Sequence, residues 1–261
     1  MLDTRVPFRG VSADPPIAVV TGASAGIGAA TARRLAREGF TIVAGARRRD
    51  RLEELAREID ATILELDVRE ADSIDAFAAE IAGRFGHADV LVNNAGLALG
   101  KSPVEAGADE DWAGMLDTNV LGLLRVTRAL LPLLRKAPHA HIVNLGSIAG
   151  FEVYKGGAGY TATKHAVRAI SRTLRLELNG EPIRVTEVAP GMVETEFSLV
   201  RFKGDQKTAD NEYKGVQPLV AEDIADVIAF CVTRPPYVNI DEVVVRPIAQ
   251  AAAYLVARKE S

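Results

Sequence analysis

Short apolar runs alternate with longer segments of helical periodicity along most of the chain. The longer segments carry apolar residues at spacings of three and four, which is typical of amphipathic helices. Strands that alternate with such helices indicate βαβ units and a parallel sheet. We therefore predict an α/β fold: one doubly wound, seven-stranded parallel sheet with helices on both faces, in a single domain. The predicted strands are IAVVT from Ile17, TIVAGA from Thr41, TILEL from Thr62, VLVN from Val90, HIVNL from His141, RVTEVA from Arg184 and DEVVV from Asp241.

Two segments interrupt this alternation. Residues 1–15 contain Gly, Ser, Asp and paired Pro without an apolar run, so we expect a flexible N-terminal extension ahead of one domain over 16–261. The segment from Pro190 to about Pro218 has no clear periodicity. Because such a stretch in a compact domain is usually a functional loop, we expect residues 190–218 to form a substrate loop.

Composition and charge narrow the function classes. At 48% apolar and 25% charged residues, the chain resembles an ordinary globular protein. A net charge of −4 gives no basic footprint for nucleic acid or an anionic membrane surface, and no stretch approaches the ~20 apolar residues of a membrane span. Cys231 is the single cysteine, so we expect no intrachain disulfide and a reducing, cytoplasmic location. His139 and His141 stand without a Cys or His cluster, so we expect no metal site.

A glycine-rich turn joins the first predicted strand to the first predicted helix. The sequence TGASAGIG contains Gly22, Gly26 and Gly28. Glycines at such a turn let the backbone approach a pyrophosphate, and the helix N-terminus then offers its amides to the phosphates. The spacing is GxxxGxG rather than GxGxxG, and a tight turn without a ligand is the alternative. The strand before it and the helix after it favour a dinucleotide site of the Rossmann type.

The residues after the second predicted strand bear on the choice of cofactor. A site for NAD is expected to carry an acid there for the ribose 2′-hydroxyl. Instead, Arg47, Arg48 and Arg49 follow, and no acid occurs before Asp50. Guanidinium groups form paired hydrogen bonds to phosphate and stack on adenine. The pattern favours the 2′-phosphate of NADP over an exposed, solvated turn.

Tyr160 and Lys164 form a YxxxK pair in a segment of helical periodicity. A spacing of four places both side chains on one face of a helix. We expect the nearby cation to lower the pKa of the phenol from ~10 by about 1–3 pH units, toward acid–base chemistry near neutral pH. Ser147 closes the fifth predicted strand at the C-terminal edge of the sheet, where open α/β sheets bind ligands. Taken singly, a surface pair and a helix-capping serine are the structural alternatives.

These motifs together resemble a known family. TGxxxGxG is followed in order by NNAG from Asn93, a helical Asn119, a serine thirteen residues before YxxxK, and a Pro190-Gly191 turn. The chain resembles the short-chain dehydrogenase/reductase family of ordinary single-domain type over nearly its whole length. The extended, epimerase type would show TGxxGxxG and a longer C-terminal region.

The resemblance implies a catalytic tetrad of Asn119, Ser147, Tyr160 and Lys164. Tyr160 would exchange a proton with the substrate oxygen, and Lys164 would depress its pKa and hold the nicotinamide ribose. Ser147 would hydrogen-bond the substrate oxygen, and Asn119 would help hold a water that links Lys164 to solvent. The cofactor-binding residues that the motifs and the resemblance together imply are Gly22, Ser24, Gly26, Ile27, Gly28, Arg47, Arg48, Asp67, Val68, Asn94, Ala95, Gly96, Tyr160, Lys164, Pro190, Gly191, Val193 and Thr195.

The substrate loop reads TEFSLVRFKGD and resembles the branch of the family that oxidises serine and related 3-hydroxy acids with NADP. It also resembles a branch that reduces bicyclic β-lactam aldehydes. Arg201 or Lys203 in this loop, or Lys155 before the YxxxK pair, would pair with a carboxylate, although each also fits a solvated loop charge. The expected substrate contacts are Ser147, Tyr154, Lys155 and Arg201. The expected function is an NADP(H)-dependent oxidoreductase for a small 3-hydroxy acid or semialdehyde.

Several alternatives remain open from the sequence. A ketone or aldehyde reductase and a 3-oxoacyl thioester reductase of the same family would share these motifs. A catalytically silent NADP(H)-binding regulator would also share the fold, but it would be expected to lose Tyr160 or Lys164. The apolar faces of the segments Trp112–Arg135 and Tyr160–Leu178 resemble those through which the family forms four-helix contacts, so we expect a homotetramer, with a dimer as the alternative.

Arg168, Arg172 and Arg175 recur at helical spacing after Tyr160. Such a row of cations could dock an acidic carrier protein. A solvated stripe on the helix surface is the expectation that we favour.

Overall fold

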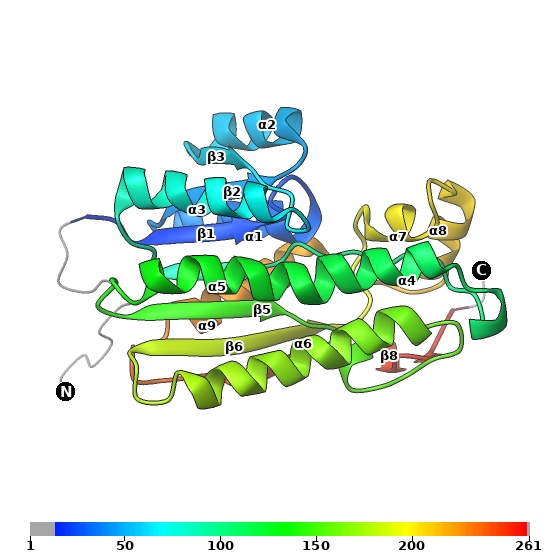
Figure 1. Cartoon of the computed structure of the whole chain (residues 1–261). Coiled ribbons are helices and arrows are strands. Elements are labelled where there is room, and N and C mark those ends of the chain that lie inside the picture. The colour runs from blue at the N-terminus through cyan, green and yellow to red at the C-terminus, as the bar shows by residue number, and fades with distance from the viewer. Residues whose placement is uncertain (1–13, 260–261) are drawn as a thin grey trace.

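The computed structural model describes residues 14–259 and is built on one parallel sheet (Figure 1). Its strand order is β3-β2-β1-β4-β5-β6-β7, so the chain starts in the middle and winds outward in both directions. All six neighbouring pairs are parallel. The strands are β1 (Ile17–Thr21), β2 (Thr41–Ala46), β3 (Thr62–Glu65), β4 (Val90–Asn93), β5 (Ala140–Leu145), β6 (Ile183–Pro190) and β7 (Glu242–Val245).

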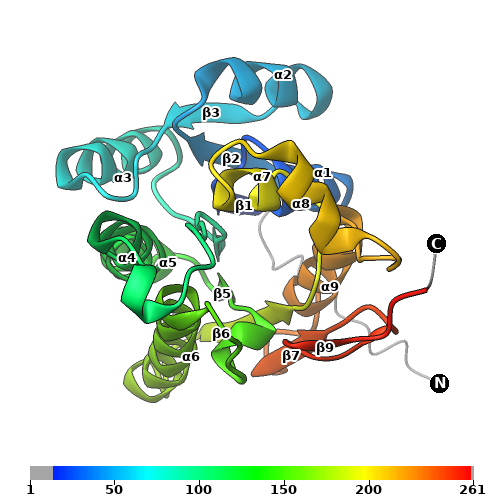
Figure 2. The same cartoon turned by 90° about the vertical axis from the view of Figure 1, so that its right-hand side faces the viewer.

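Helices cover both faces of the sheet (Figure 2). Phe77 and Leu130 are buried in the core on one face, and Leu35 and Ile224 in the core on the other. Sheets buried on both sides need apolar residues at nearly every strand position, which the runs of valine and isoleucine supply. One layer holds α3 (Ala71–Phe85), α4 (Asp109–Leu116), α5 (Leu123–Leu134) and α6 (Ala158–Glu177), and the other holds α1 (Gly26–Arg37), α2 (Arg49–Ile59) and α9 (Ala221–Val232).

The predicted fold class is confirmed, and the seven strands lie where the apolar runs placed them, within a few residues at their ends. The expected substrate loop is not structureless, because it contains the short helices α7 (Phe197–Arg201) and α8 (Gln206–Tyr213). Both lie above the C-terminal edge of the sheet (Figure 2). Most of the expected N-terminal extension, residues 1–13, lies outside the described residues.

The chain does not end with β7. A two-stranded antiparallel sheet of β8 (Gln250–Ala252) and β9 (Leu255–Val256) follows it. Glu152 accepts hydrogen bonds from the Arg246 guanidinium and from the backbone of Ala253. The C-terminal segment is thereby held against the loop after β5, near the functional edge of the sheet. No periodicity in the sequence indicated these two short strands.

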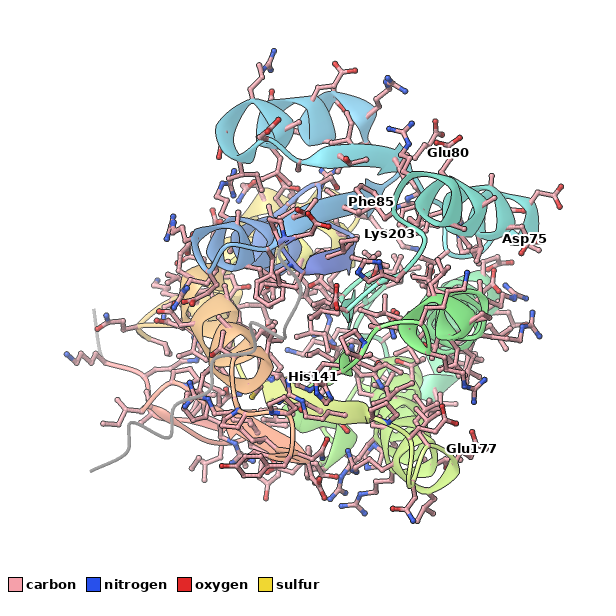
Figure 3. The ribbon with its side chains drawn as sticks, turned by 90° about the vertical axis from the view of Figure 1, so that its left-hand side faces the viewer. Asp75, Glu80, Phe85, His141, Glu177 and Lys203 are labelled. Carbon is pink, nitrogen blue, oxygen red and sulfur yellow. The ribbon has the colours of Figure 1, made fainter. Side chains whose placement is uncertain are left out.

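His141, a residue of β5, lies inside the fold, whereas Glu80 and Glu177 are on the outer surfaces of α3 and α6 (Figure 3). His141 is fully buried and its Nε2 lies 2.8 Å from Oγ1 of Thr186, while burial lowers its pKa well below the usual value. Within residues 14–259 no group of metal-ligating side chains forms, and no helix is long and apolar enough to span a bilayer.

The three arginines of α6 form an ion-pair cluster with the neighbouring strand. Glu242 at the start of β7 lies 2.7 Å from Arg172, 3.6 Å from Arg168 and 3.6 Å from Arg175. The favoured prediction of a solvated stripe is therefore wrong for Arg168 and Arg175, whose side chains are 27% and 17% exposed. The sheet edge supplies an acid that local periodicity could not indicate.

Candidate active site

The glycine-rich turn forms one wall of a cavity of about 860 Å³ at the C-terminal edge of the sheet. Gly22 and Gly26 adopt φ angles of +64° and +51°, which L side chains rarely tolerate. A Cβ at Gly28 would lie 2.4 Å from the side-chain nitrogen of Asn94. Gly28 is therefore buried behind the turn, whereas Gly22, Gly26 and Ile27 line the cavity at the start of α1, where helix amides and the helix dipole favour an anion. This cradle fits the pyrophosphate of a dinucleotide.

The loop after β4 is fixed above this turn by hydrogen bonds from β1. Thr21 Oγ1 accepts from the backbone amides of Asn94 and Ala95, at 3.0 Å each. The Asn94 side chain donates in return to the Thr21 carbonyl, 2.9 Å away. These bonds hold the NNAG segment, including Gly96, along the cavity wall. The residues expected to contact the adenosine ribose therefore lie beside the glycine turn.

Three arginines line one end of the same cavity: the predicted Arg47 and Arg48, and Arg69, which the sequence reasoning did not single out. Arg48 donates to Ser24 Oγ at 3.2 Å. Arg69 forms an ion pair with Asp67 at 2.6 Å, and chiefly through this bond it lowers the pKa of that carboxyl; Arg47 contributes more weakly. A cationic end beside the glycine turn suits the 2′-phosphate of NADP.

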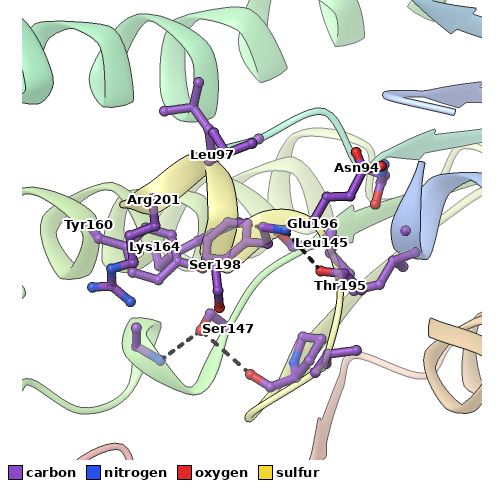
Figure 4. Close-up of a pocket in the computed structure, with 18 of the residues that line it drawn as sticks. Asn94, Leu97, Leu145, Ser147, Tyr160, Lys164, Thr195, Glu196, Ser198 and Arg201 are labelled. Atoms are coloured by element: carbon purple, nitrogen blue, oxygen red, sulfur yellow. Dashed lines mark hydrogen bonds between the residues drawn. The ribbon is translucent and has the colours of Figure 1, made fainter. Parts of the chain in front are cut away.

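Ser147, Tyr160 and Lys164 meet in the middle of the cavity (Figure 4). Ser147 Oγ accepts from the Ala149 amide at 3.1 Å and donates to the Pro190 carbonyl at 3.5 Å. Tyr160 and Lys164 are one turn apart on α6, and the Lys164 ammonium lies 5.8 Å from the centre of the Tyr160 ring. The ammonium donates to the Leu145 carbonyl at 2.7 Å. Residues from β5, its following loop and α6 thus share one site.

The pKa of Tyr160 differs from the sequence-based expectation. Burial raises it to about 12, whereas Ser147 and, more weakly, Arg201 lower it. Lys164 is not among the groups that lower it, and its ammonium donates to the Leu145 carbonyl instead. Burial also lowers the pKa of Lys164 to about 8. The phenol is therefore protonated at neutral pH and able to donate a proton.

Asn119 lies in a π-helical segment, Asp117–Gly122, that links α4 to α5. Its side-chain oxygen accepts from the Leu97 amide at 2.8 Å. Its side-chain nitrogen donates to the Leu97 carbonyl at 2.8 Å and to Thr163 Oγ1 at 3.0 Å. These bonds fix the loop after β4 against α6, next to Lys164. They leave one lone pair on the amide oxygen with which Asn119 could hold a water.

The other half of the cavity is lined by the expected substrate residues. Arg201 donates to the Tyr154 hydroxyl at 2.5 Å and to the Gly100 carbonyl at 3.2 Å, and its guanidinium lies 5.6 Å from the Tyr160 ring centre. Lys155 is exposed at the cavity wall. Lys203 does not line the cavity, because it forms an ion pair with Asp111 at 2.8 Å. Of the three cations considered for a carboxylate, Arg201 both lines the cavity and lies beside the ring of Tyr160.

The substrate loop is attached to the rest of the cavity at several points. Tyr213 joins α7 to the loop backbone, because its hydroxyl lies 2.6 Å from Ser198 Oγ and donates to the Val193 carbonyl. Thr195 packs against Gly26 of the glycine turn. Gln250 accepts from the Met192 amide at 2.8 Å, and Tyr254 also lines the cavity. The sequence carried no signal for these C-terminal contributions.

The chain is similar in sequence and in fold to several known oxidoreductases. A model of the short chain dehydrogenase family matches residues 16–205. An uncharacterised oxidoreductase of Mycobacterium tuberculosis is 56% identical over 238 residues, covering 91% of this chain and 93% of that protein. The NADP-dependent 3-hydroxy acid dehydrogenase YdfG of Escherichia coli is 43% identical over 242 residues, covering 92% and 98%. The closed form of a serine dehydrogenase complexed with NADP+ has a TM-score of 0.88 at 42% identity, covering 94% and 100%.

The fold and the cavity define an oxidoreductase of the dinucleotide-binding Rossmann class. The chain belongs to the short-chain dehydrogenase family, as the resemblance in its sequence implied. Enzymes of this class act on CH–OH groups, so the predicted enzyme class is confirmed.

Proposed function

We propose that this short-chain dehydrogenase interconverts small 3-hydroxy acids, or the matching semialdehydes, with their oxidation or reduction partners. The observation that carries the proposal is the position of Arg201, whose guanidinium lies 5.6 Å from the ring of Tyr160. In a 3-hydroxy acid, two carbon–carbon bonds separate the carboxyl carbon from the carbinol carbon. A hydroxyl at Tyr160 would therefore bring the carboxylate within reach of a paired contact with Arg201.

The cofactor is NADP(H), as the arginines after β2 predicted. YdfG is named for its NADP dependence, and the serine dehydrogenase structure contains NADP+. When bound, the nicotinamide supplies the hydride chemistry of the reaction. In this chain the glycine turn and the α1 N-terminus would hold the pyrophosphate, and Arg47 and Arg48 the 2′-phosphate.

The four tetrad residues would transfer the proton, orient the substrate and hold the nicotinamide ribose. Tyr160 would donate its proton to a carbonyl oxygen during reduction and take it back during oxidation. Ser147 would hydrogen-bond the same oxygen and so orient the substrate toward the phenol. Lys164 would hold the nicotinamide ribose, and Asn119 would keep the loop and helix around Lys164 in register.

A matched pair of substrates tests the proposal. A 3-hydroxy acid without an amino group, such as 3-hydroxybutanoate, is compared with its neutral methyl ester, in an assay that follows NADPH absorbance. Loss of a charge-assisted contact of ~1.5–3 kcal/mol predicts a kcat/KM about ten- to a hundredfold higher for the acid. Arg201→Ala should raise KM for the acid and leave KM for the ester nearly unchanged, and Lys203→Ala is the control.

If neutral ketones, aldehydes or 3-oxoacyl thioesters proved far better substrates than every 3-hydroxy acid, the proposed substrate class would be wrong. The assignment to the short-chain dehydrogenase family would be unaffected.

We also propose a homotetramer in the cytoplasm. Apolar side chains are exposed on the helices expected to form the contacts, namely Leu116 on α4, Leu124 on α5 and Leu176 on α6. A single free, buried cysteine, Cys231, is compatible with a reducing compartment.

A further inference from the structure

A carboxyl group is buried directly behind the active site. Glu187 lies on β6 between Asn144 of β5 and Glu242 of β7, and its side chain has no exposed surface. Neither of its carboxyl oxygens is hydrogen-bonded to any residue within 14–259. A buried acid without hydrogen bonds is costly, so its position calls for a compensating charge.

The carboxyl is packed against the segment that also binds Lys164. A Cβ at Gly146 would lie only 2.2 Å from Oε1 of Glu187, so the glycine leaves the space that the carboxyl occupies. The preceding residue, Leu145, accepts the hydrogen bond from the Lys164 ammonium at 2.7 Å. Ser147 follows immediately. Glu187 and Lys164 therefore approach the same short stretch of backbone, one from the strand and one from the helix.

The charges around Glu187 come from the two elements packed against it. On α6 they are Lys164, Arg168, Arg172 and Arg175, and on β7 the only one is Glu242 among the described residues. Glu242 already lies within ion-pair distance of the three arginines.

Fewer groups determine the protonation state of Lys164. Burial disfavours its charged form, and the one group that favours the ammonium is Glu187. The pKa of Glu187 is itself raised to about 7, chiefly by burial and then by Glu242, against the pull of Lys164, Arg168 and Arg175. Between about pH 7 and pH 8 the carboxylate and the ammonium are therefore opposite charges in one buried region.

We propose that Glu187 is a positioning residue of the active site, whose buried carboxylate is the counter-charge that keeps the Lys164 ammonium protonated and held at the Leu145 carbonyl. The inference rests on the proposed role of Lys164. Glu187 does not line the cavity, and it acts through Lys164.

The pH dependence of NADPH-driven carbonyl reduction tests this inference. In this direction Tyr160 must be protonated, which its high pKa ensures, so the decline of kcat/KM at alkaline pH reports Lys164. Removing an opposite charge shifts a pKa by about one pH unit or more. In Glu187→Gln the decline should therefore begin about one pH unit lower than in the wild type, while Glu187→Asp should restore most of the original profile.

Glu242→Gln is the matched control, because Glu242 is an acid of the same cluster that does not act on Lys164. In Glu242→Gln the decline of kcat/KM at alkaline pH should coincide with that of the wild type. An unshifted decline in a folded Glu187→Gln enzyme, or an equal shift in Glu242→Gln, would overturn the inference. If Tyr160→Phe kept its turnover, the proposed catalytic tetrad would be wrong. This result is separate from the pH profile of Glu187→Gln, so failure of the tetrad can be distinguished from failure of the role of Glu187.

A measurement on the wild type keeps the inference testable if Glu187→Gln does not fold. Carbon-13 NMR of labelled glutamate in the cofactor-free enzyme, with Glu187 assigned through Glu187→Asp, follows the carboxyl directly. We expect it to ionise near neutral pH. A carboxyl that stays protonated up to roughly pH 9 supplies no counter-charge, and that result would exclude the role.

Discussion

The guanidinium of Arg48 donates a hydrogen bond to the carboxylate of Glu196 across 2.8 Å, and so joins the start of α2 to the substrate loop. Both side chains are nearly half exposed, so the pair contributes only about 0.2–1 kcal/mol. It nevertheless occupies the cation that we assign to the 2′-phosphate of NADP. Glu196 and that phosphate therefore compete for Arg48.

This competition yields a prediction for cofactor affinity. Glu196→Gln should tighten NADPH binding by up to about fivefold, because the phosphate no longer displaces a carboxylate, and should leave NADH binding unchanged. Fluorescence titration of the reduced cofactors measures both affinities. Equal tightening for NADPH and NADH would show that Glu196 acts on the loop rather than on the 2′-phosphate site.

Replacing Arg47 and Arg48 by serine should have the opposite effect. The double variant should lose about ten- to a hundredfold in NADPH affinity, since a charge-assisted contact is worth ~1.5–3 kcal/mol, and most of the preference over NADH should disappear. Arg49→Ser is the control, because Arg49 pairs with Glu53 on the surface of α2. If titration of the wild type gave equal affinities for NADPH and NADH, the assignment of Arg47 and Arg48 to the 2′-phosphate would be wrong.

Tyr160→Phe removes only the hydroxyl that exchanges the proton. Turnover should fall by roughly two or more orders of magnitude while NADPH still binds, which steady-state kinetics and titration can separate. Lys164→Ala should weaken both, because Lys164 is proposed to hold the ribose as well. Tyr237→Phe, at an 84% exposed position, should behave as the wild type.

The raised pKa of Glu187 makes a prediction for stability. A group whose pKa is higher in the folded state stabilises the fold at low pH, and this contribution disappears as the pH rises through the folded-state pKa. For Glu187 the window runs from the usual 4.5 to about 7, and the loss is of order 3 kcal/mol at most. Relative to the wild type, Glu187→Gln should therefore gain stability between about pH 5 and pH 8.

Thermal unfolding of the two proteins side by side measures this difference. The comparison cancels contributions from other groups that titrate in both proteins, such as His141, whose lowered pKa has the opposite effect. A constant difference in Tm across this range would contradict the buried charge. Lower activity together with higher stability is the expected signature of a charge kept for function.

The proposed tetramer predicts that a charge on the exposed helix surface disrupts assembly. Leu124→Glu, at a position 40% exposed on α5, should reduce the mass measured by light scattering from four chains to fewer. Val104→Glu, at an exposed position outside these helices, should leave the mass unchanged. A wild type that is monomeric at micromolar concentration would refute the assembly itself.

Local chemistry determined much of this protein in advance. The apolar runs and their spacing are enough to place the strands and most helices, because a parallel strand and an amphipathic helix each have a short-range signature. Gly22, Gly26 and Gly28 indicated a backbone cradle, because the backbone approach they permit depends on the missing Cβ. The spacing of Tyr160 and Lys164 likewise fixed their common face on α6.

Tertiary structure decided what depends on distant neighbours. The partners of Arg168 and Arg175, the ion pair that removes Lys203 from the cavity, and the C-terminal residues around Met192 all come from contacts between elements far apart in sequence. The pKa of Tyr160 belongs to the same group. Its value depends on burial and on how Lys164 is oriented, and both are set only when β5, β6 and α6 have packed together.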